Sequence, residues 1–241
     1  MKINVIKPTV DLITPSSHIL DAEKLIEKAG RTCYKSEDKI TPLSANAFVE
    51  RIVQSGHLSV IEHINVTMKF VGDRSMSHQL VRHRLAAYSQ ESQRYCNYLD
   101  KGWSVICPPK VADIKPATYI HNYDNYGNWG TDDPDIKILT DRNAIAFLDA
   151  MADAFRSYES FKIHGAPSED ARCVLPNAVK TEVVATYNLR TWRHLFDHRA
   201  LNPRAQWQIR GLMQESLRIL SKYVPAAFAD QLETLNRQEK E

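Results

Sequence analysis

Hydrophobic and polar residues alternate with a period of two along INVTMKFV, residues 64–71. This period places neighbouring side chains on opposite faces of an extended chain, so it predicts a strand with one buried face. Four other short segments rich in apolar and β-branched residues are also predicted to be strands. These segments are residues 3–6, 10–13, 103–109 and 179–188.

Other segments carry their apolar residues at the spacing of an α-helix. In residues 43–56, Phe48, Ile52 and Val53 fall on one helix face and Gly56 ends the segment. Further helices are predicted over 21–30, from an Asp73 cap to about Arg84, over 136–163, 167–176 and 189–199, and from an Asn202–Pro203 cap to about Tyr223. Residues 113–135 are rich in Tyr, Asn, Asp and Gly, and we expect a surface insertion there. The mixture predicts an α+β protein with a single domain over residues 1–241.

The composition limits the kinds of ligand that the chain is expected to bind. With 31 basic and 29 acidic residues the net charge is +2, so no global field attracts nucleic acid. Only 8 of 241 residues are glycine, and neither a GxGxxG nor a GxxxxGKS/T loop occurs. A bound phosphate would therefore be held mainly by side-chain cations and helix N-termini.

Cysteine usage and hydropathy indicate the cellular compartment in which the protein is found. Cys33, Cys96, Cys107 and Cys173 are scattered and form no CxxC pair, as in proteins of a reducing compartment. The N-terminus lacks the apolar run of a signal peptide, and no stretch reaches the roughly 18 apolar residues of a membrane helix. We therefore expect a cytoplasmic protein that does not enter a membrane.

Polar residues gather in three segments where an ordinary core or surface has little need for them. The first is HLSVIEH at 57–63, and the second is QLVRHRLAAYSQESQRY at 79–95. The third consists of Arg172, Asn188, Arg190, His194 and Arg199 and continues into RAQWQIR at 204–210. Several arginines favour a multiply anionic ligand, because the guanidinium fork matches phosphate oxygens.

Helical spacing groups some of these residues further. Arg190, His194 and His198 stand at i, i+4 and i+8, which predicts a cationic stripe on one helix face. Gln79 and Arg82 stand at i and i+3, so they are expected to share a helix face and to bind one ligand together.

Each segment taken alone also has a simpler explanation. A charged helix end such as Arg82–Arg84 is often only a solvated surface, and His57 and His63 suit an ordinary helix–strand junction. A metal site formed by His57, Glu62 and His63 would have an order that matches no zinc pattern, so no metal is predicted. Ser92 lacks the GxSxG elbow of a hydrolase nucleophile. The functional interpretation depends on the three segments occurring together.

Arg82, His83 and Arg84, followed after seven residues by Ser92, resemble the RHR-x7-S signature of the flavin-dependent thymidylate synthases. Other segments resemble that family in the same order: GHLSVIEH at 56–63, QLVRHR at 79–84, SQRY at 92–95, ARCVLP at 171–176 and the stretch from NLR at 188 to RAQWQIR at 210. The resemblance covers roughly residues 30–100 and 165–225. It implies a central, mostly antiparallel sheet flanked by helices, a homotetramer with shared active sites, and no binding of nucleic acid.

The resemblance also implies a reaction and its cofactors. The family methylates dUMP to dTMP with 5,10-methylenetetrahydrofolate as carbon donor and NADPH-reduced FAD as hydride source. In such enzymes the flavin performs the difficult step, while the protein binds, orients and polarises. The resemblance assigns dUMP binding to Gln79, Leu80, Val81, Arg82, Gln90, Glu91, Ser92, Gln93, Arg94, Arg172 and Arg199. It assigns FAD binding to Ser59, Glu62, Arg82, His83, Arg84, Gln90, Asn188, Leu189, Arg190 and His194.

Three residues are expected to serve the reaction itself. Arg199 matches the arginine at the uracil, where a fixed cation favours ionisation at N3. Ser92 belongs to the loop that wraps the nucleotide, and His57 resembles the residue at the flavin ring and the folate or nicotinamide entry.

Two rival interpretations follow from the same residues. A single-stranded nucleic-acid-binding protein could use Arg82–Arg84 as cations and Tyr88 and Tyr95 as stacking aromatics. A flavoprotein of the same fold could instead have lost the methylation step.

Overall fold

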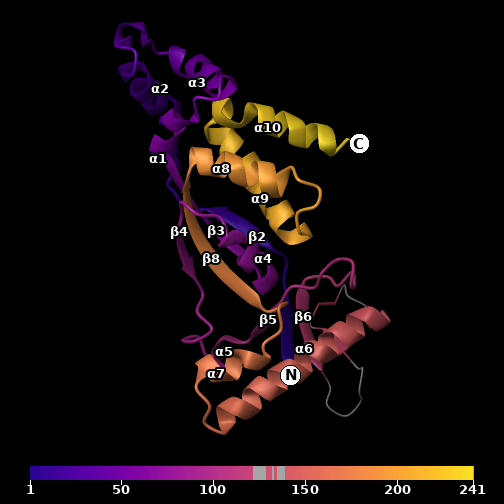
Figure 1. The fold of residues 1–241 in the computed structure, drawn as a ribbon. Helices are drawn as coiled ribbons and strands as arrows, with labels where there is room; N and C mark the ends of the chain where they lie inside the picture. The colour runs from indigo at the N-terminus through magenta and orange to yellow at the C-terminus, as the bar shows by residue number, and fades with distance from the viewer. Residues whose placement is uncertain (122–128, 132, 135–138, 241) are drawn as a thin grey trace. The chain divides into compact units, whose positions relative to one another are not determined.

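The computed structural model describes residues 1–121, 129–131, 133–134 and 139–240 (Figure 1). These residues divide into two compact units. Unit one contains Met1–Pro8, Val71–His78 and Gln90–Glu182, and unit two contains Thr9–Phe70, Gln79–Ser89 and Val183–Glu241. Four elements contain residues of both units: β3 (Asn65–Asp73), α4 (Arg74–Leu80), β4 (Ala87–Gln90) and β8 (Lys180–Asn188). The prediction that the whole chain makes one domain stays a prediction.

Unit one is built on a four-stranded sheet. Its strand order is β5 (Trp103–Val105), β1 (Lys2–Val5), β6 (Ala117–His121) and β7 (Trp129–Thr131). Strand β1 pairs in parallel with β5 and antiparallel with β6, which pairs antiparallel with β7. The helical elements are α5 (Tyr98–Lys101), α6 (Arg142–Ile163), α7 (Ser168–Ala171) and the 3-10 turn η3 (Arg172–Val174).

An aromatic cluster forms the core of unit one. Trp103 stacks on Phe155 with ring centroids 4.1 Å apart, and Tyr158 meets Trp103 edge-on at 5.4 Å. Offset and edge-on pairs of this kind stabilise a core by about 0.5–1.5 kcal/mol each beyond area burial. They join helix α6 to β5, the strand that follows residues 90–102.

Unit two contains most of a second sheet, of order β2 (Thr9–Leu12), β3, β8 and β4. Its helices are α1 (Ser16–Ile19), α2 (Ala22–Thr32), α3 (Ser44–Gln54), α8 (Leu189–Leu195), α9 (Trp207–Tyr223) and α10 (Pro225–Gln238). Three shorter turns complete it: η1 (Glu37–Lys39), η2 (Leu58–His63) and the π-helical turn η4 (Phe196–Ala200). Helix α9 packs against α10 and η4.

Trp192 is the central core residue of unit two. Its side chain is fully buried, and its ring contacts Phe70, Tyr187 and Phe196 at centroid distances of 6.4, 4.8 and 5.7 Å. Its indole N–H donates to the Val66 carbonyl at 3.2 Å, so the buried polar atom is satisfied. Trp192 therefore fixes α8, and the turn that follows it, on strands β3 and β8.

The α+β class and most of the predicted elements are confirmed, but the strands form two sheets. The predicted surface insertion is partly wrong: within 113–135, strands β6 and β7 join the first sheet, and Tyr119 and Trp129 are buried. Residues 122–128, 132 and 135 of that insertion lie outside the described residues. These strands were missed because the composition of the segment, rich in Tyr, Asn, Asp and Gly, favours a loop.

Several predicted helix ends differ from the structure. The helix expected from 136 is described from Arg142, because Asp141 accepts the Asn143 amide and caps it; residues 136–138 lie outside the described residues. The predicted Asn202 cap is wrong, since Gln206 accepts from the backbone amides that begin α9. Helix α10, with Pro225 in its first turn, was not predicted.

The helices described here offer no membrane span, since none is both long and apolar enough to cross a bilayer.

Candidate active site

Arg199 lies in the π-helical turn η4 and contacts the signature segment. Its Nε donates to His83 Nε2 at 3.0 Å and its Nη1 donates to Gln79 Oε1 at 2.7 Å. The pKa of His83 is lowered to about 4, first by burial and then by the charges of Arg199, His194 and His198. A neutral imidazole can accept from Arg199, whereas an imidazolium cannot. Both acceptors are thus neutral and leave the guanidinium charge uncompensated.

The segment that carries the signature leaves its helix earlier than predicted. Asp73 does cap α4, accepting the Met76 amide at 2.7 Å, but the helix ends at Leu80 and not near Arg84. Gln79 and Arg82 therefore do not share a helix face, and Arg82 is exposed in the turn that follows. Gln79 and His83 are instead brought together by Arg199.

Tyr88 explains why the chain turns after Leu80. Its hydroxyl lies 2.5 Å from the His83 carbonyl and 3.0 Å from the Leu80 carbonyl, and it accepts from the Tyr187 hydroxyl at 2.9 Å. Burial raises the pKa of Tyr88, so the phenol keeps its proton to donate. These bonds satisfy carbonyls at the end of α4 and in the turn that follows it.

A pocket of about 500 Å³ opens in unit two beside this turn. It is lined by Glu62, Arg84, Leu85, Asn188, Arg190, Thr191 and His194. Arg190 pairs with Glu62 at 2.6 Å, and the Asn188 side chain accepts the Thr191 amide at 2.8 Å, which begins α8. The pocket combines two guanidinium groups, an imidazole and an apolar side chain, a set that fits a ligand with both phosphate and ring parts.

Leu85 has an unusual backbone at the rim of this pocket. Its φ is 64°, in the left-handed region that a non-glycine residue rarely adopts, and its side chain is 85% exposed. Such conformations cost about 1–3 kcal/mol and persist only where the surroundings impose them. The Tyr88 bonds to the preceding carbonyls supply that constraint.

The imidazoles of unit two are close neighbours. His194 lies edge-on to His198 with centroids 4.2 Å apart, and 5.8 Å from His83. His194 and His198 are thus neighbours, but the predicted cationic stripe on one helix face is wrong, because α8 ends at Leu195, His198 lies in η4 and His194 favours its neutral form. Burial and the charge of His198 lower the pKa of His194, which favours its neutral form.

Half of the ten residues assigned to the flavin by resemblance line the pocket. Glu62, Arg84, Asn188, Arg190 and His194 line it, and His83 lies beside His194. Leu189 is fully buried, and its backbone amide donates to the Ile64 carbonyl at 3.0 Å, so it does not line the pocket. Ser59 and His57 are exposed in and before η2, Arg82 is exposed, and Gln90 belongs to unit one.

In unit one, the loop that begins at Gln90 is held by polar contacts along its length. The Gln90 amide donates to Ser77 Oγ at 3.1 Å and to Thr181 Oγ1 at 3.2 Å. Arg74 donates to Gln93 Oε1 at 3.3 Å, and Gln93 is buried. Gln90 and Gln93 thus anchor the loop with the side chains that the resemblance assigned to the nucleotide.

Glu91 belongs to a charged network of its own. Its carboxylate accepts from Lys180 at 2.9 Å and from the Tyr98 hydroxyl at 3.1 Å, and Lys180 also pairs with Glu182 at 2.6 Å. Burial would lower the pKa of Lys180, but hydrogen bonds to Glu182 and Glu91 outweigh it and raise that pKa. The Glu91 backbone amide donates to the Glu182 carbonyl at 2.9 Å. Glu91 therefore fastens the loop to strand β8.

Arg94 and Arg172, both assigned to dUMP by the resemblance, meet at one residue. Arg94 Nε donates to Glu169 Oε2 at 2.9 Å, and Arg172 Nε donates to the Glu169 carbonyl oxygen at 3.0 Å. The Ser92 hydroxyl accepts the Arg94 backbone amide at 3.3 Å. The Arg94–Glu169 pair is about half exposed on both sides, so it is worth about 1 kcal/mol or less and a phosphate can displace it.

The residues assigned to dUMP belong to both units. Gln79, Leu80, Val81, Arg82 and Arg199 lie in unit two, and Gln90, Glu91, Ser92, Gln93, Arg94 and Arg172 lie in unit one. Leu80 is fully buried, and its carbonyl already accepts from the Tyr88 hydroxyl and the His83 amide. The structure brings together Gln79 with Arg199 and Arg94 with Arg172; the complete nucleotide site stays a prediction.

Sequence reasoning missed three supporting residues. Tyr187, Lys180 and Glu169 contact assigned residues, yet 99, 89 and 75 positions separate them from their partners Tyr88, Glu91 and Arg94. Of the three, only Tyr187 could have been found from the sequence, because the alternation along β8 places it on the buried face of the strand.

Comparison with known proteins agrees with the resemblance that the sequence motifs indicate. Residues 16–226 match the family described as thymidylate synthase complementing protein. A flavin-dependent thymidylate synthase of Geobacter sulfurreducens is 34% identical over 220 residues, which cover 88% of this chain and 83% of that protein. One from Mycobacterium tuberculosis (strain ATCC 25618 / H37Rv) is 38% identical over 210 residues, covering 86% and 78%.

A solved structure shows the same fold. The UMP/dUMP methylase PolB from Streptomyces cacaoi, bound with 5-Br dUMP, superposes with a TM-score of 0.72 over 95% of this chain and 96% of that chain. The two sequences are 21% identical, so this likeness bears on the fold alone.

Proposed function

Because the chain belongs to the thymidylate synthase complementing protein family and is similar to its flavin-dependent thymidylate synthases, we propose that it methylates dUMP to dTMP. The carbon donor is 5,10-methylenetetrahydrofolate, and NADPH supplies the reducing equivalents through FAD. The protein is a cytoplasmic homotetramer with active sites shared between subunits. It binds neither nucleic acid nor membranes.

The arrangement of Arg199 is the observation that supports this proposal best. Its guanidinium is fixed by the neutral acceptors His83 and Gln79, so its charge remains for a ligand. Placed beside a uracil, a fixed cation lowers the cost of removing the N3 proton, and the resulting anion carries more electron density on the ring carbon that is methylated. Such preorganised electrostatic stabilisation is usually the largest single contribution to catalysis.

The phosphate of dUMP takes the place of Glu169 on Arg94. The dianion offers stronger charge-assisted bonds than the half-exposed carboxylate, and Arg172 adds a second guanidinium. Ser92 contributes its hydroxyl to the same loop. Until the substrate arrives, the contacts with Glu169 keep both arginines ordered.

The pocket in unit two suits FAD by the chemistry of its lining. Arg84 and Arg190 match the two charges of a pyrophosphate, and Leu85 with His194 provides surfaces for a ring. When bound, the flavin supplies the hydride chemistry that no side chain can perform. Glu62 orients Arg190 toward the pocket, and His57 lies before η2, the segment that also carries Glu62.

An absorbance spectrum of the purified protein, followed by anaerobic NADPH oxidation with and without dUMP, tests the proposal. We expect flavin bands, faster oxidation when dUMP is present, and formation of dTMP once methylenetetrahydrofolate is added. A colourless protein that gains no flavin band with added FAD would contradict it. A flavoprotein that oxidises NADPH but forms no dTMP would support the interpretation of a fold that has lost methylation.

A further inference from the structure

Arg199 lies in a helical turn of unusual geometry. Helix α8 ends at Leu195 and continues as the π-helical turn η4, in which the Leu201 amide donates to the Phe196 carbonyl five residues back, at 2.9 Å. A π turn contains one more residue than an α turn, is intrinsically rare and often occurs at functional sites. Because the extra residue rotates every later side chain about the axis, the direction of Arg199 depends on this turn.

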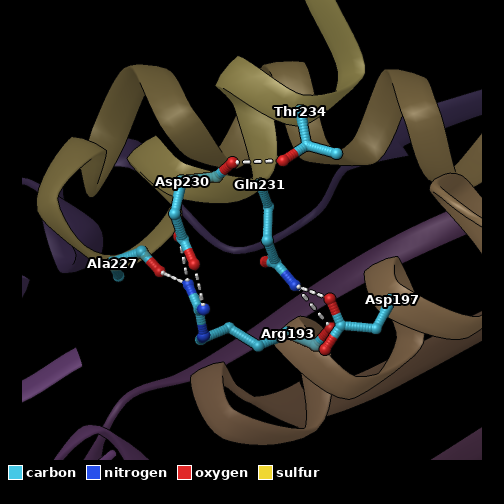
Figure 2. A network of polar contacts seen from close by, with 6 residues as sticks. All are labelled: Arg193, Asp197, Ala227, Asp230, Gln231 and Thr234. Atoms are coloured by element: carbon cyan, nitrogen blue, oxygen red, sulfur yellow. Dashed lines mark hydrogen bonds and ion pairs between the residues drawn. The ribbon is translucent and has the colours of Figure 1, made fainter. Parts of the chain in front are cut away.

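Gln231 of helix α10 reaches the junction where the geometry changes. Its Nε2 donates to the Arg193 carbonyl at 2.9 Å, in the last turn of α8, and to Asp197 Oδ1 at 2.6 Å, in η4 (Figure 2). Gln231 is 3% exposed, so water cannot easily replace these bonds. Both partners are acceptors, and only the NH₂ end of the amide can serve them. The side chain is therefore fixed in one orientation.

A second set of bonds holds α10 against α8. The Arg193 guanidinium binds both carboxylate oxygens of Asp230, at 2.8 and 2.6 Å, and donates to the Ala227 carbonyl at 2.5 Å (Figure 2). Burial would raise the pKa of Asp230, but the bonds and charge of Arg193 lower it overall. This clamp of Arg193, Asp230 and Ala227 holds α10 against α8 and includes no residue of η4. A variant can therefore weaken the docking of α10 while the bonds between Gln231 and η4 stay in place.

We propose that Gln231 is a positioning residue for Arg199. By holding Asp197 and the Arg193 carbonyl at a fixed separation, it maintains the π turn that aims the guanidinium at Gln79 and His83. Without Gln231 the turn can relax toward ordinary α geometry, and Arg199 then points away from these acceptors. The inference rests on the proposed function only where its test measures turnover of dUMP.

The chain offers variants that separate positioning from docking. Gln231→Leu removes the donor at similar size, and Gln231→Glu replaces it with an acceptor that repels Asp197. Asp230→Ala weakens the clamp but leaves the Gln231 bonds in place, so it is the matched control. Asp197→Ala removes the other end of the bond at an exposed position, where loss of folding is not expected.

Turnover and thermal unfolding of the flavin-loaded enzyme are measured for all four variants. We expect both Gln231 variants to lose about tenfold or more in kcat/KM for dUMP, because small misplacements of a catalytic group are costly. Asp197→Ala should lose about threefold or more in the same constant. Asp230→Ala should lower Tm by about as much as Gln231→Leu, roughly 5 °C, yet keep kcat/KM within about threefold of the parent. In Gln231→Glu, adding Asp197→Asn should restore part of the activity, because the new amide can donate to the introduced carboxylate.

A second measurement does not depend on the reaction. The His83 imidazole is titrated by NMR in the parent, Gln231→Leu, Asp197→Ala and Asp230→Ala proteins. Withdrawal of Arg199 removes a positive charge beside His83, so its pKa should rise by about 1 in the first two variants and stay in place in the third. A parent that forms no dTMP overturns the proposed function, and this titration still decides the role of Gln231. Folded Gln231→Leu and Asp197→Ala proteins with an unshifted His83, or an equal shift in Asp230→Ala, would overturn the inference.

Discussion

The Arg199 guanidinium donates to the His83 imidazole at 3.0 Å, across 116 positions of sequence. The contact has two consequences. It fixes the direction of the cation, and it adds to burial, the larger cause, in lowering the pKa of His83 and so favouring the neutral form that can accept a hydrogen bond. The conspicuous run of charge at residues 82–84 therefore contains, at its centre, a residue that is uncharged near neutral pH.

Replacing Arg199 should abolish most of the turnover while sparing the flavin. Arg199→Ala removes the cation at the uracil, and we expect kcat to fall by about 100-fold or more. Arg199→Lys keeps a charge but loses the two-pronged geometry, so it should recover only a small part. The measurement is dTMP formation together with the flavin content of the purified protein. Arg237→Ala, at an exposed position near the end of α10, is the control; near-normal turnover in Arg199→Ala would exclude the assigned role.

Stability should depend on pH through His83. Its pKa is about 4 in the folded protein and 6.5 ordinarily, so between these values the unfolded chain binds more protons. Stability contributed by neutral His83 is therefore present above pH 6.5 and is lost as the pH falls toward 4. The full shift corresponds to roughly 3 kcal/mol, and solvent contact reduces this to about 1–2 kcal/mol.

Urea unfolding at several pH values tests this dependence in the parent and in His83→Gln, whose amide oxygen can still accept from Arg199. The variant should lose less stability between pH 6.5 and 4 than the parent. His18→Gln, which replaces an exposed histidine, is the control, and its free energy of unfolding should change with pH as in the parent. An equal loss of unfolding free energy between pH 6.5 and 4 in the parent and in His83→Gln would contradict the prediction.

Lys180 should matter more to stability than an ordinary surface lysine. Lys180→Met leaves Glu91 and Glu182 without their shared partner, and both pairs are largely shielded from solvent. We expect the free energy of unfolding to fall by about 1–3 kcal/mol, as measured by chemical denaturation. In Lys24→Met, which breaks a largely exposed pair with Asp21, the change should stay below about 0.5 kcal/mol. A cost for Lys180→Met no larger than for Lys24→Met would show that the network adds nothing.

Arg190 should affect flavin binding far more than folding. The Arg190–Glu62 pair is about half exposed, so its loss should cost about 1 kcal/mol or less. Arg190→Ala should nevertheless weaken FAD binding by about tenfold, because a charge-assisted phosphate contact is lost. Fluorescence titration of the apoprotein measures this, with Arg51→Ala on the exposed side of α3 as control. An unchanged affinity in Arg190→Ala would place the flavin outside this pocket.

The helix at residues 73–84 illustrates how far local pattern reaches. The Asp73 cap was predictable, because it depends on a bond to the amide three residues later. The early end at Leu80 was not, because it depends on Tyr88 and on its partner Tyr187, 99 positions away in sequence. The same reason applies to the insertion, where β6 pairs with the distant strand β1 and β7 pairs with β6.

The sequence by itself determined the α+β class, the alternating strands and the residues that resemble a nucleotide- and flavin-binding family. These depend on periodicity, on caps and on motif spacing, all of which are local. Tertiary structure alone decided that Arg199 meets His83 and Gln79, that Glu91 anchors its loop to Lys180, and that Gln231 holds the π turn. Such contacts join side chains of neighbouring elements, and a pattern confined to a few consecutive residues cannot encode them.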